Sequence, residues 1–339
     1  MSPKSAPLWI ILLMSLFSCV SYQKYSMEVF KPGDKSLPDN MKKVALVARN
    51  LKYKSDTLQN YQAKNNRLVK DKKIINVDSL TITSCFDSLA NRLLQQSRFD
   101  SVLVLPYNAL PVMRVSEIRP AKADWYKKLA ARTGADGLIL LDMFSCFYSV
   151  NSELGTANVV TSNIWSVMNA EGKLLDRFAQ IDTLYWDQTD ESGTYKKYKI
   201  PDKKSAVSLA AGVIGQNYSR RFLPGWTTVS RDIMATGNSD FQKAANLALK
   251  NKWKEATPIW EKYLNSPKRL HRLVATYNMA LSNEMDGNID RAIELVAEAA
   301  KLSSGYFSKL ENESVRKYAA VLEIRRNEIK KLNQQHETN

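Results

Sequence analysis

The hydrophobic periodicity changes once along this chain, near residue 237, and this change limits the fold to two differently built regions. Before it, short apolar runs with strand character alternate with stretches whose apolar residues recur every three or four positions, as in amphipathic helices. After it, only the helical spacing is present. The length agrees with two regions, because 339 residues correspond to about two domains of ~150 residues.

Residues 42–236 predict the element order β-α-β-α-β-β-β-α-β. We expect strands at 44–48, 102–105, 138–141, 157–168, 174–186 and 226–234, and helices at about 82–94, 122–132 and 203–222. The polar stretch 50–78 is expected to be an excursion, partly helical or mobile. This order predicts an α+β fold, a mixed sheet with helices packed on it, over a domain at 42–236.

The region 237–335 contains an internal repeat of small residues. Two alanines 12 positions apart precede a bulky residue in each copy, and the copies are offset by 36 positions (292 − 256): Ala244, Ala248, Ala256 and Trp260, then Ala280, Glu284, Ala292 and Val296. This pattern resembles tetratricopeptide repeats, with Asn251 and Gly287 at the helix–helix turns. Asn283 departs from the family pattern, and a helix at about 309–334 is expected to cap an all-α domain.

Such repeats form a concave surface that binds peptides or protein segments. Only two copies are visible, fewer than the usual three. The helices are therefore equally consistent with a lid that packs on the α/β domain without an outside partner. Trp260 and Tyr277 are expected in the core.

The N-terminus carries an apolar run over residues 8–17, too short to cross a bilayer, and it ends in Leu16-Phe17-Ser18-Cys19. This resembles the lipobox of bacterial lipoproteins, which implies that 1–18 is a signal peptide and that Cys19 is the lipidated first residue of the mature protein. An ordinary secretory signal is the alternative. Val20 follows the cysteine without an aspartate or an acidic cluster, which favours the outer membrane with the protein facing the periplasm. Residues 19–41 are expected to be a tether.

The formal charge is +15, or +14 (15 − 1) once Lys4 leaves with the signal peptide. Basic surfaces attract anions, but the basic residues are scattered here. Because the lipobox resemblance places the chain in the envelope, we expect no nucleic-acid partner, a membrane contact through the lipid anchor, and an envelope protein or peptidoglycan as partner. Arg220 and Arg221, beside Trp226, are candidates for binding a partner or an anion. The dipole at a helix C-terminus would explain the two arginines equally well.

The passage from a helix through Gly134-Ala135-Asp136-Gly137 into an apolar strand resembles the N-terminal domain of TolB and the curli-export and penicillin-binding-protein-activator lipoproteins. The run from Gln216 to Trp226 resembles a segment of an uncharacterised family of Gram-negative lipoproteins that joins such a domain to C-terminal helices. These resemblances imply an envelope lipoprotein, and they imply no particular reaction.

Catalytic, metal and cofactor groups are not evident in the sequence, so we predict none and no enzyme activity. The two histidines, His271 and His336, lack neighbours at ligand spacing. The function expected is a non-catalytic binding or assembly module. The alternatives are a cell-wall glycan hydrolase using the carboxylates of Asp182, Asp187, Asp190 and Glu191, and a subunit of a secretion pore. The partner's identity, the oligomeric state, the leaflet and a Cys85–Cys146 disulfide stay open.

Overall fold

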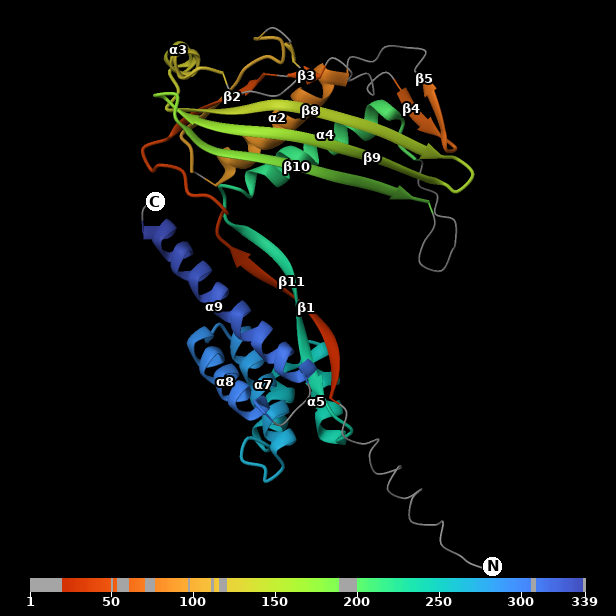
Figure 1. The fold of residues 1–339 in the computed structure, drawn as a ribbon, viewed down its shortest axis with the longest axis vertical. Coiled ribbons are helices and arrows are strands. Elements are labelled where there is room, and N and C mark those ends of the chain that lie inside the picture. Colours follow the sequence, from red (N-terminus) through yellow and green to blue (C-terminus); the bar gives the residue numbers. More distant parts are fainter. Residues whose placement is uncertain are drawn as a thin grey trace, which may run out of the picture. The chain divides into compact units, whose positions relative to one another are not determined.

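The chain divides into two compact units in the computed structural model, which describes residues 20–49, 51–53, 61–70, 77–96, 98–110, 113–115, 121–188, 200–305 and 309–337. The α/β unit runs from Gly33 to Leu223. The helical unit combines the N-terminal residues up to Pro32 with the C-terminal residues from Pro224. Figure 1 shows the helices and strands of both units.

The α/β unit is built on a mixed sheet whose main strands have the order β10-β9-β8-β2-β6. Strand β2 pairs in parallel with both β6 and β8, and β8, β9 and β10 continue as an antiparallel meander. The bounds are β2 (Lys43–Ala48), β6 (Ser101–Val104), β8 (Gly137–Asn151), β9 (Thr156–Asn169) and β10 (Leu174–Asp187). The apolar sequence of β2 fits its central place, because this strand is buried on both faces.

Two short strand pairs lie within stretches that were not expected to contain strands. Strands β4 (Tyr61–Lys64) and β5 (Arg67–Lys70) form a hairpin, and β4 also pairs with β8. Strands β3 (Lys52–Tyr53) and β7 (Arg114–Val115) make a separate parallel pair. The hairpin turns at Asn65 and Asn66, which both have positive φ angles. The polar stretch 50–78 therefore contains strands where a partly helical excursion was predicted.

Helices cover the sheet on both faces (Figure 1). Helices α2 (Val77–Gln95) and α4 (Lys203–Ser219) pack together on one side, and α3 (Ala123–Thr133) packs on the other. Close approach of α2 and α4 requires glycine at 215, where a Cβ atom would lie 2.1 Å from the Cys85 carbonyl oxygen. Trp165 of β9 stacks on Tyr218 of α4 with ring centroids 4.1 Å apart. Cys85 and Cys146 are both buried in this core as free thiols.

The mixed sheet with packed helices confirms the predicted fold class. The last strand expected in the α/β domain, at 226–234, is part of the helical unit instead. Strand β11 (Gly225–Ala235) pairs with β1 (Ser21–Lys31) in an antiparallel two-stranded ribbon of eleven residue pairs. Its inward residues pack on the C-terminal helices, because Ile233 joins their core rather than that of the sheet. The segment 19–41, expected to be a tether, contains β1.

The helical unit contains two helical hairpins followed by a long helix, as the repeat predicted. The helices are α5 (Ser239–Leu249), α6 (Trp253–Glu261), α7 (Arg269–Met285), α8 (Ile289–Ser303) and α9 (Lys309–Glu337). Asn251 and Gly287 lie at the two hairpin turns with φ angles of 60° and 80°. The repeated alanines are fully buried where helices approach closely, and Trp260 and Tyr277 lie in the core as expected.

Candidate functional site

The candidate binding residues Arg220, Arg221 and Trp226 belong to different units. The arginines end helix α4 in the α/β unit, whereas Trp226 lies in β11 of the helical unit. Trp226 is 64% exposed and packs against Phe30 across the ribbon, with ring centroids 5.3 Å apart. Arg220 is exposed.

Arg221 is held by the α/β unit itself. Its guanidinium donates two hydrogen bonds to the carboxylate of Asp176, at 2.6 and 2.9 Å. It also lies over the ring of Phe178, 4.4 Å from the centroid, and 3.7 Å from Asp34. The hydrogen bond to Asp176 raises the pKa of Arg221. Bidentate pairing of this kind fixes a guanidinium in place, so Arg221 joins the end of α4 to strand β10.

The carboxylates proposed for glycan cleavage are not paired where the structure describes them. Asp182 and Asp187 are five residues apart on β10, so their side chains point to opposite faces of the sheet, ~16 Å apart along the strand. Paired catalytic carboxylates of glycosidases lie roughly 5–9.5 Å apart. Asp190 and Glu191 lie outside the described residues.

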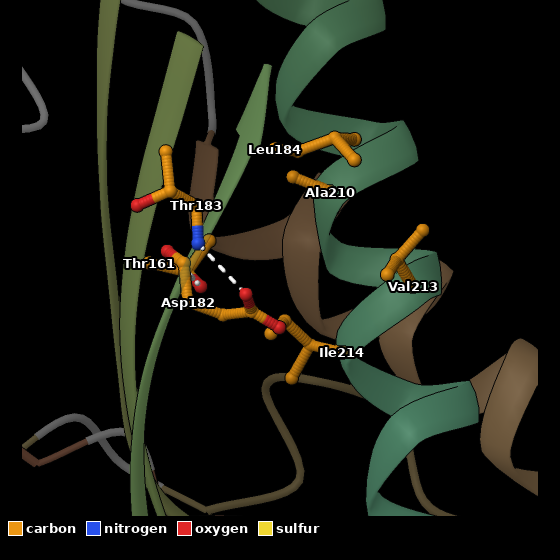
Figure 2. Close-up of a pocket in the computed structure, with 7 residues that line it drawn as sticks. All are labelled: Thr161, Asp182, Thr183, Leu184, Ala210, Val213 and Ile214. Carbon is orange, nitrogen blue, oxygen red and sulfur yellow. Dashed lines mark hydrogen bonds between the residues drawn. The ribbon is translucent and has the colours of Figure 1, made fainter. Parts of the chain in front are cut away.

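Asp182 borders a small hollow between the sheet and α4 (Figure 2). Its carboxylate accepts hydrogen bonds from the backbone N–H of Thr183 at 2.8 Å and from the amide of Asn217 at 3.3 Å. The hollow has a volume of about 20 Å³, and its other lining residues are Thr161, Thr183, Leu184, Ala210, Val213 and Ile214. This volume holds about one water molecule.

A polar cluster that the sequence analysis did not single out lies at the end of the central strand. Arg49 follows β2 directly, and Asp142 lies at a bulge in β8, between Leu141 and Met143. In the sheet, β6 lies on one side of β2 and β8 lies on the other, so the connections leave β2 and β6 in opposite directions. A position of this kind is a topological switch point, and open α/β sheets usually bind their ligands there. The signal in the sequence is a lone aspartate within the apolar run Leu138-Ile139-Leu140-Leu141-Asp142-Met143-Phe144.

The hydrogen bonds of this cluster are satisfied internally. The Asp142 carboxylate accepts from Arg49 at 3.2 Å and from the Ser166 hydroxyl at 2.6 Å. Arg49 also donates to the Tyr126 hydroxyl, which in turn accepts from the backbone N–H of Ala121. Burial raises the pKa of Asp142, while Ser166 and Arg49 act in the opposite direction. The cluster ties β2, β8, β9 and α3 together at the switch point.

One side of the helical unit is covered by the chain's own β1–β11 ribbon. The first helices of the two repeats, α5 and α7, pack against β11, and α9 packs against β1. Asn278 of α7 bonds both backbone groups of Met234, accepting from its N–H at 3.0 Å and donating to its carbonyl at 2.7 Å. The β1–β11 ribbon therefore packs on the first helix of each repeat and on α9.

Further polar contacts hold the ribbon along its length. Arg231 of β11 donates to both carboxylate oxygens of Glu284 on α7, which also accepts from the hydroxyl of Tyr318 on α9 at 2.9 Å. The Tyr25 hydroxyl of β1 donates to Asn251 at 2.7 Å and accepts from the indole of Trp253. These contacts make the ribbon an integral part of the helical core.

The predicted lipidation site, Cys19, lies outside the described residues, which begin at Val20. Val20 is buried in the helical core, and β1 begins at the next residue. Within the part of the chain that the structure describes, every helix is too short or too polar to span a bilayer. The same residues contain no group of three or more metal-binding side chains. His271 packs against the rings of Phe241 and Tyr263.

Comparison with known families assigns more than half of the sequence to one of them. The chain belongs to the family described as Domain of unknown function (DUF8603). The DUF8603 match covers residues 41–233, which contain most of the α/β unit and most of β11 but not β1. Residues 242–324, within α5 to α9, match a second family, Domain of unknown function (DUF6340). The DUF8603 and DUF6340 descriptions state no activity, and none of the curated proteins matches this chain.

Proposed function

We propose that this chain is a lipoprotein anchored through Cys19 in the outer membrane, where it faces the periplasm as a non-catalytic binding or assembly module. Its relation to TolB-like and curli-export-like lipoproteins is part of the same proposal. The placement of Val20 and β1 supports the anchor, because the residues that follow Cys19 are built into a folded core.

The observation that carries the binding role is an exposed apolar surface on the α/β unit. The face of β9 and β10 that points away from α4 presents Ile181 and Tyr185, which are 76% and 56% exposed. Val160 of β9 lies between them, directly opposite Thr183, and is also exposed. Contiguous exposed apolar side chains of this kind mark interaction surfaces. We call these three residues the β9–β10 patch.

A non-catalytic role also agrees with how the charged side chains of this unit are used. Arg221 is paired with Asp176, Arg49 with Asp142, and Asp182 with backbone and amide donors. The apolar character of the β9–β10 patch favours an envelope protein over peptidoglycan as the partner.

The anchor is tested by comparing the chain with its Cys19→Ser variant. We expect palmitate labelling, an increased mass of the mature N-terminal peptide and membrane association for the natural sequence, and loss of all three in the variant. Unchanged membrane association and unchanged mass would overturn the proposal.

The binding role is tested by crosslinking in intact envelopes followed by mass spectrometry. Ile181→Asp with Tyr185→Ser is expected to remove a specific crosslinked protein. Leu68→Ser is the matched control, since Leu68 is a 63% exposed apolar residue on the β4–β5 hairpin. The same crosslinks in both variants would contradict the assignment of the patch. Release of peptidoglycan fragments by the purified chain would favour the hydrolase alternative.

A further inference from the structure

The distance between the proposed anchor and the helical core is very short. Val20 is 7% exposed and packs in that core, and Ser21 is already paired with Ala235. Cys19 and Ser21 are two positions apart in the chain, which limits their Cα atoms to ~7 Å apart. A lipid on Cys19 would therefore hold the helical unit at the membrane surface without a flexible spacer.

The hydrogen bonds to the ribbon show which end of the helices points toward the anchor. Along α7, Asn278 bonds Met234, and Glu284 bonds Arg231. Helix α7 therefore runs antiparallel to β11, and its N-terminal end extends beyond the ribbon on the side of Ser21. Arg272 precedes Asn278 by six residues, ~9 Å along the helix, whereas the ribbon ends ~3 Å past Met234.

Two further hydrogen bonds show how α5 and α6 are oriented relative to Ser21. The Tyr25 hydroxyl meets Asn251 after the C-terminal end of α5, so the N-terminal end of α5 lies toward Ser21. The Tyr263 hydroxyl, just after α6, donates to Asp240 in the first turn of α5. The end of α6 and the start of α7 therefore lie on the anchor side of the helical unit.

The chain from the end of α6 through the first turn of α7 is strongly basic. Residues Lys262–Arg272 contain Lys262, Lys268, Arg269 and Arg272 and no Asp or Glu. Lys262 and Lys268 are exposed. Arg269 and Arg272 donate hydrogen bonds to the carbonyl groups of Leu302 and Ser266. We call this stretch the basic α6–α7 segment.

We infer that the basic α6–α7 segment lies against anionic phospholipid headgroups, so that the helical unit is docked directly on the membrane. This inference rests on the lipid anchor of the proposed function. The occupant follows from two observations, the short distance from Cys19 and the charge of the segment. Basic residues next to an anionic lipid surface are attracted to it within about a Debye length, ~8 Å at physiological salt.

The test is a depth measurement on the lipidated full chain in vesicles of phosphatidylglycerol and phosphatidylethanolamine. A spin label is placed at Asn265→Cys in the basic α6–α7 segment or at Thr228→Cys on the ribbon, both exposed positions. Thr228 lies seven residues from Ala235, ~23 Å along β11 away from the anchor side. Lipids carrying chelated nickel at the headgroup should relax the label at 265 strongly and the label at 228 weakly.

Charge-reversal variants separate docking from mere nearness to the anchor. Lys262→Glu with Lys268→Glu should reduce the relaxation of the label at 265 several-fold in anionic vesicles. Lys250→Glu with Lys254→Glu makes the same change in charge at the α5–α6 turn, away from the anchor side, and should leave it unchanged.

The outcomes distinguish the two proposals. Suppose that mass spectrometry shows acyl groups on Cys19. Equal relaxation of the labels at 265 and 228, or equal effects of the two charge reversals, would then overturn the docking but not the anchor. A chain without acyl groups on Cys19 would overturn the proposed function and the docking together.

Discussion

In the α/β unit, the side chains that form the core come from one continuous stretch, Gly33–Leu223, whereas the helical unit joins residues from the two ends of the chain. Tyr25 bonds a residue 226 positions away, and the Phe30 carbonyl accepts from Arg325, 295 positions away. Such contacts form only after long segments of chain have been closed into loops, which costs conformational entropy. The helical unit therefore depends on a few polar contacts to hold a strand that is distant in sequence.

The largest effect is expected from the ion pair that fixes the ribbon to α7. Glu284→Ala would leave Arg231 buried without its carboxylate and Tyr318 without its acceptor, and should cost about 3–5 kcal/mol. Urea unfolding followed by hydrogen exchange should show the loss in β1, β11 and α5 to α9, with the α/β unit unchanged. Glu255→Ala removes an exposed pair with Lys252 and should cost less than ~1 kcal/mol. Equal losses of stability in the two units would show that this ion pair does not act on the helical unit alone.

The next effect tests whether a helix side chain holds β11 by its backbone. Asn278→Ala removes both hydrogen bonds to Met234 and leaves buried backbone groups unpaired, which should cost ~2–3 kcal/mol. Amide exchange at β1 and β11 should accelerate more than exchange at α8. Asn283→Ala is the control, because Asn283 bonds only a carbonyl of its own helix, that of Met279. If the control accelerated exchange in the ribbon equally, Asn278 would have no special role.

A substitution in the other unit should leave the helical unit untouched. Gly215→Ala places a Cβ atom against the Cys85 carbonyl and should destabilise the α/β unit by ~1–3 kcal/mol through forced separation of α2 and α4. Gly225→Ala is the matched control, since a Cβ atom there meets nothing within 4 Å. Thermal unfolding monitored at Trp165 fluorescence or by exchange in α2 checks the expectation, and an unchanged midpoint would contradict it.

The smallest effect concerns pH and comes from His271 on α7, in the helical unit. Burial and the charge of Lys268 lower the pKa of His271 below its usual 6.5. As the pH falls, the unfolded chain therefore binds a proton at His271 before the folded chain does. The contribution of His271 to stability is present above pH 6.5 and is lost as the pH falls below 6.5 toward the lower pKa of the folded state. His271→Gln should flatten the stability of the helical unit between pH 7 and 5. An unchanged slope would exclude His271 as its source.

The candidate site was only partly predictable, and particular residues show why. Arg220 and Arg221 were recognised as adjacent charges at a helix end, but their partner Asp176 is 45 residues from Arg221, and pairing at that distance depends on how β10 and α4 pack. The Arg49–Asp142 cluster depends on a bulge in β8, which one aspartate in an apolar run does not specify. Asp182 and Asp187 looked like neighbours in sequence, and the pleat of one strand places them on opposite faces.

The sequence by itself determined the helices of both units and the main strands of the sheet, because strand alternation, helical spacing and turn residues such as Asn251 and Gly287 act over a few neighbouring positions. It also determined the helical repeat, since small residues are required wherever two helices approach closely. Only the tertiary structure decided that β11 leaves the sheet and that residues 21–31 pair with it. A strand's pattern states which of its faces is buried, but its partner is selected by packing, here by Ile233 and Asn278 in the helical core.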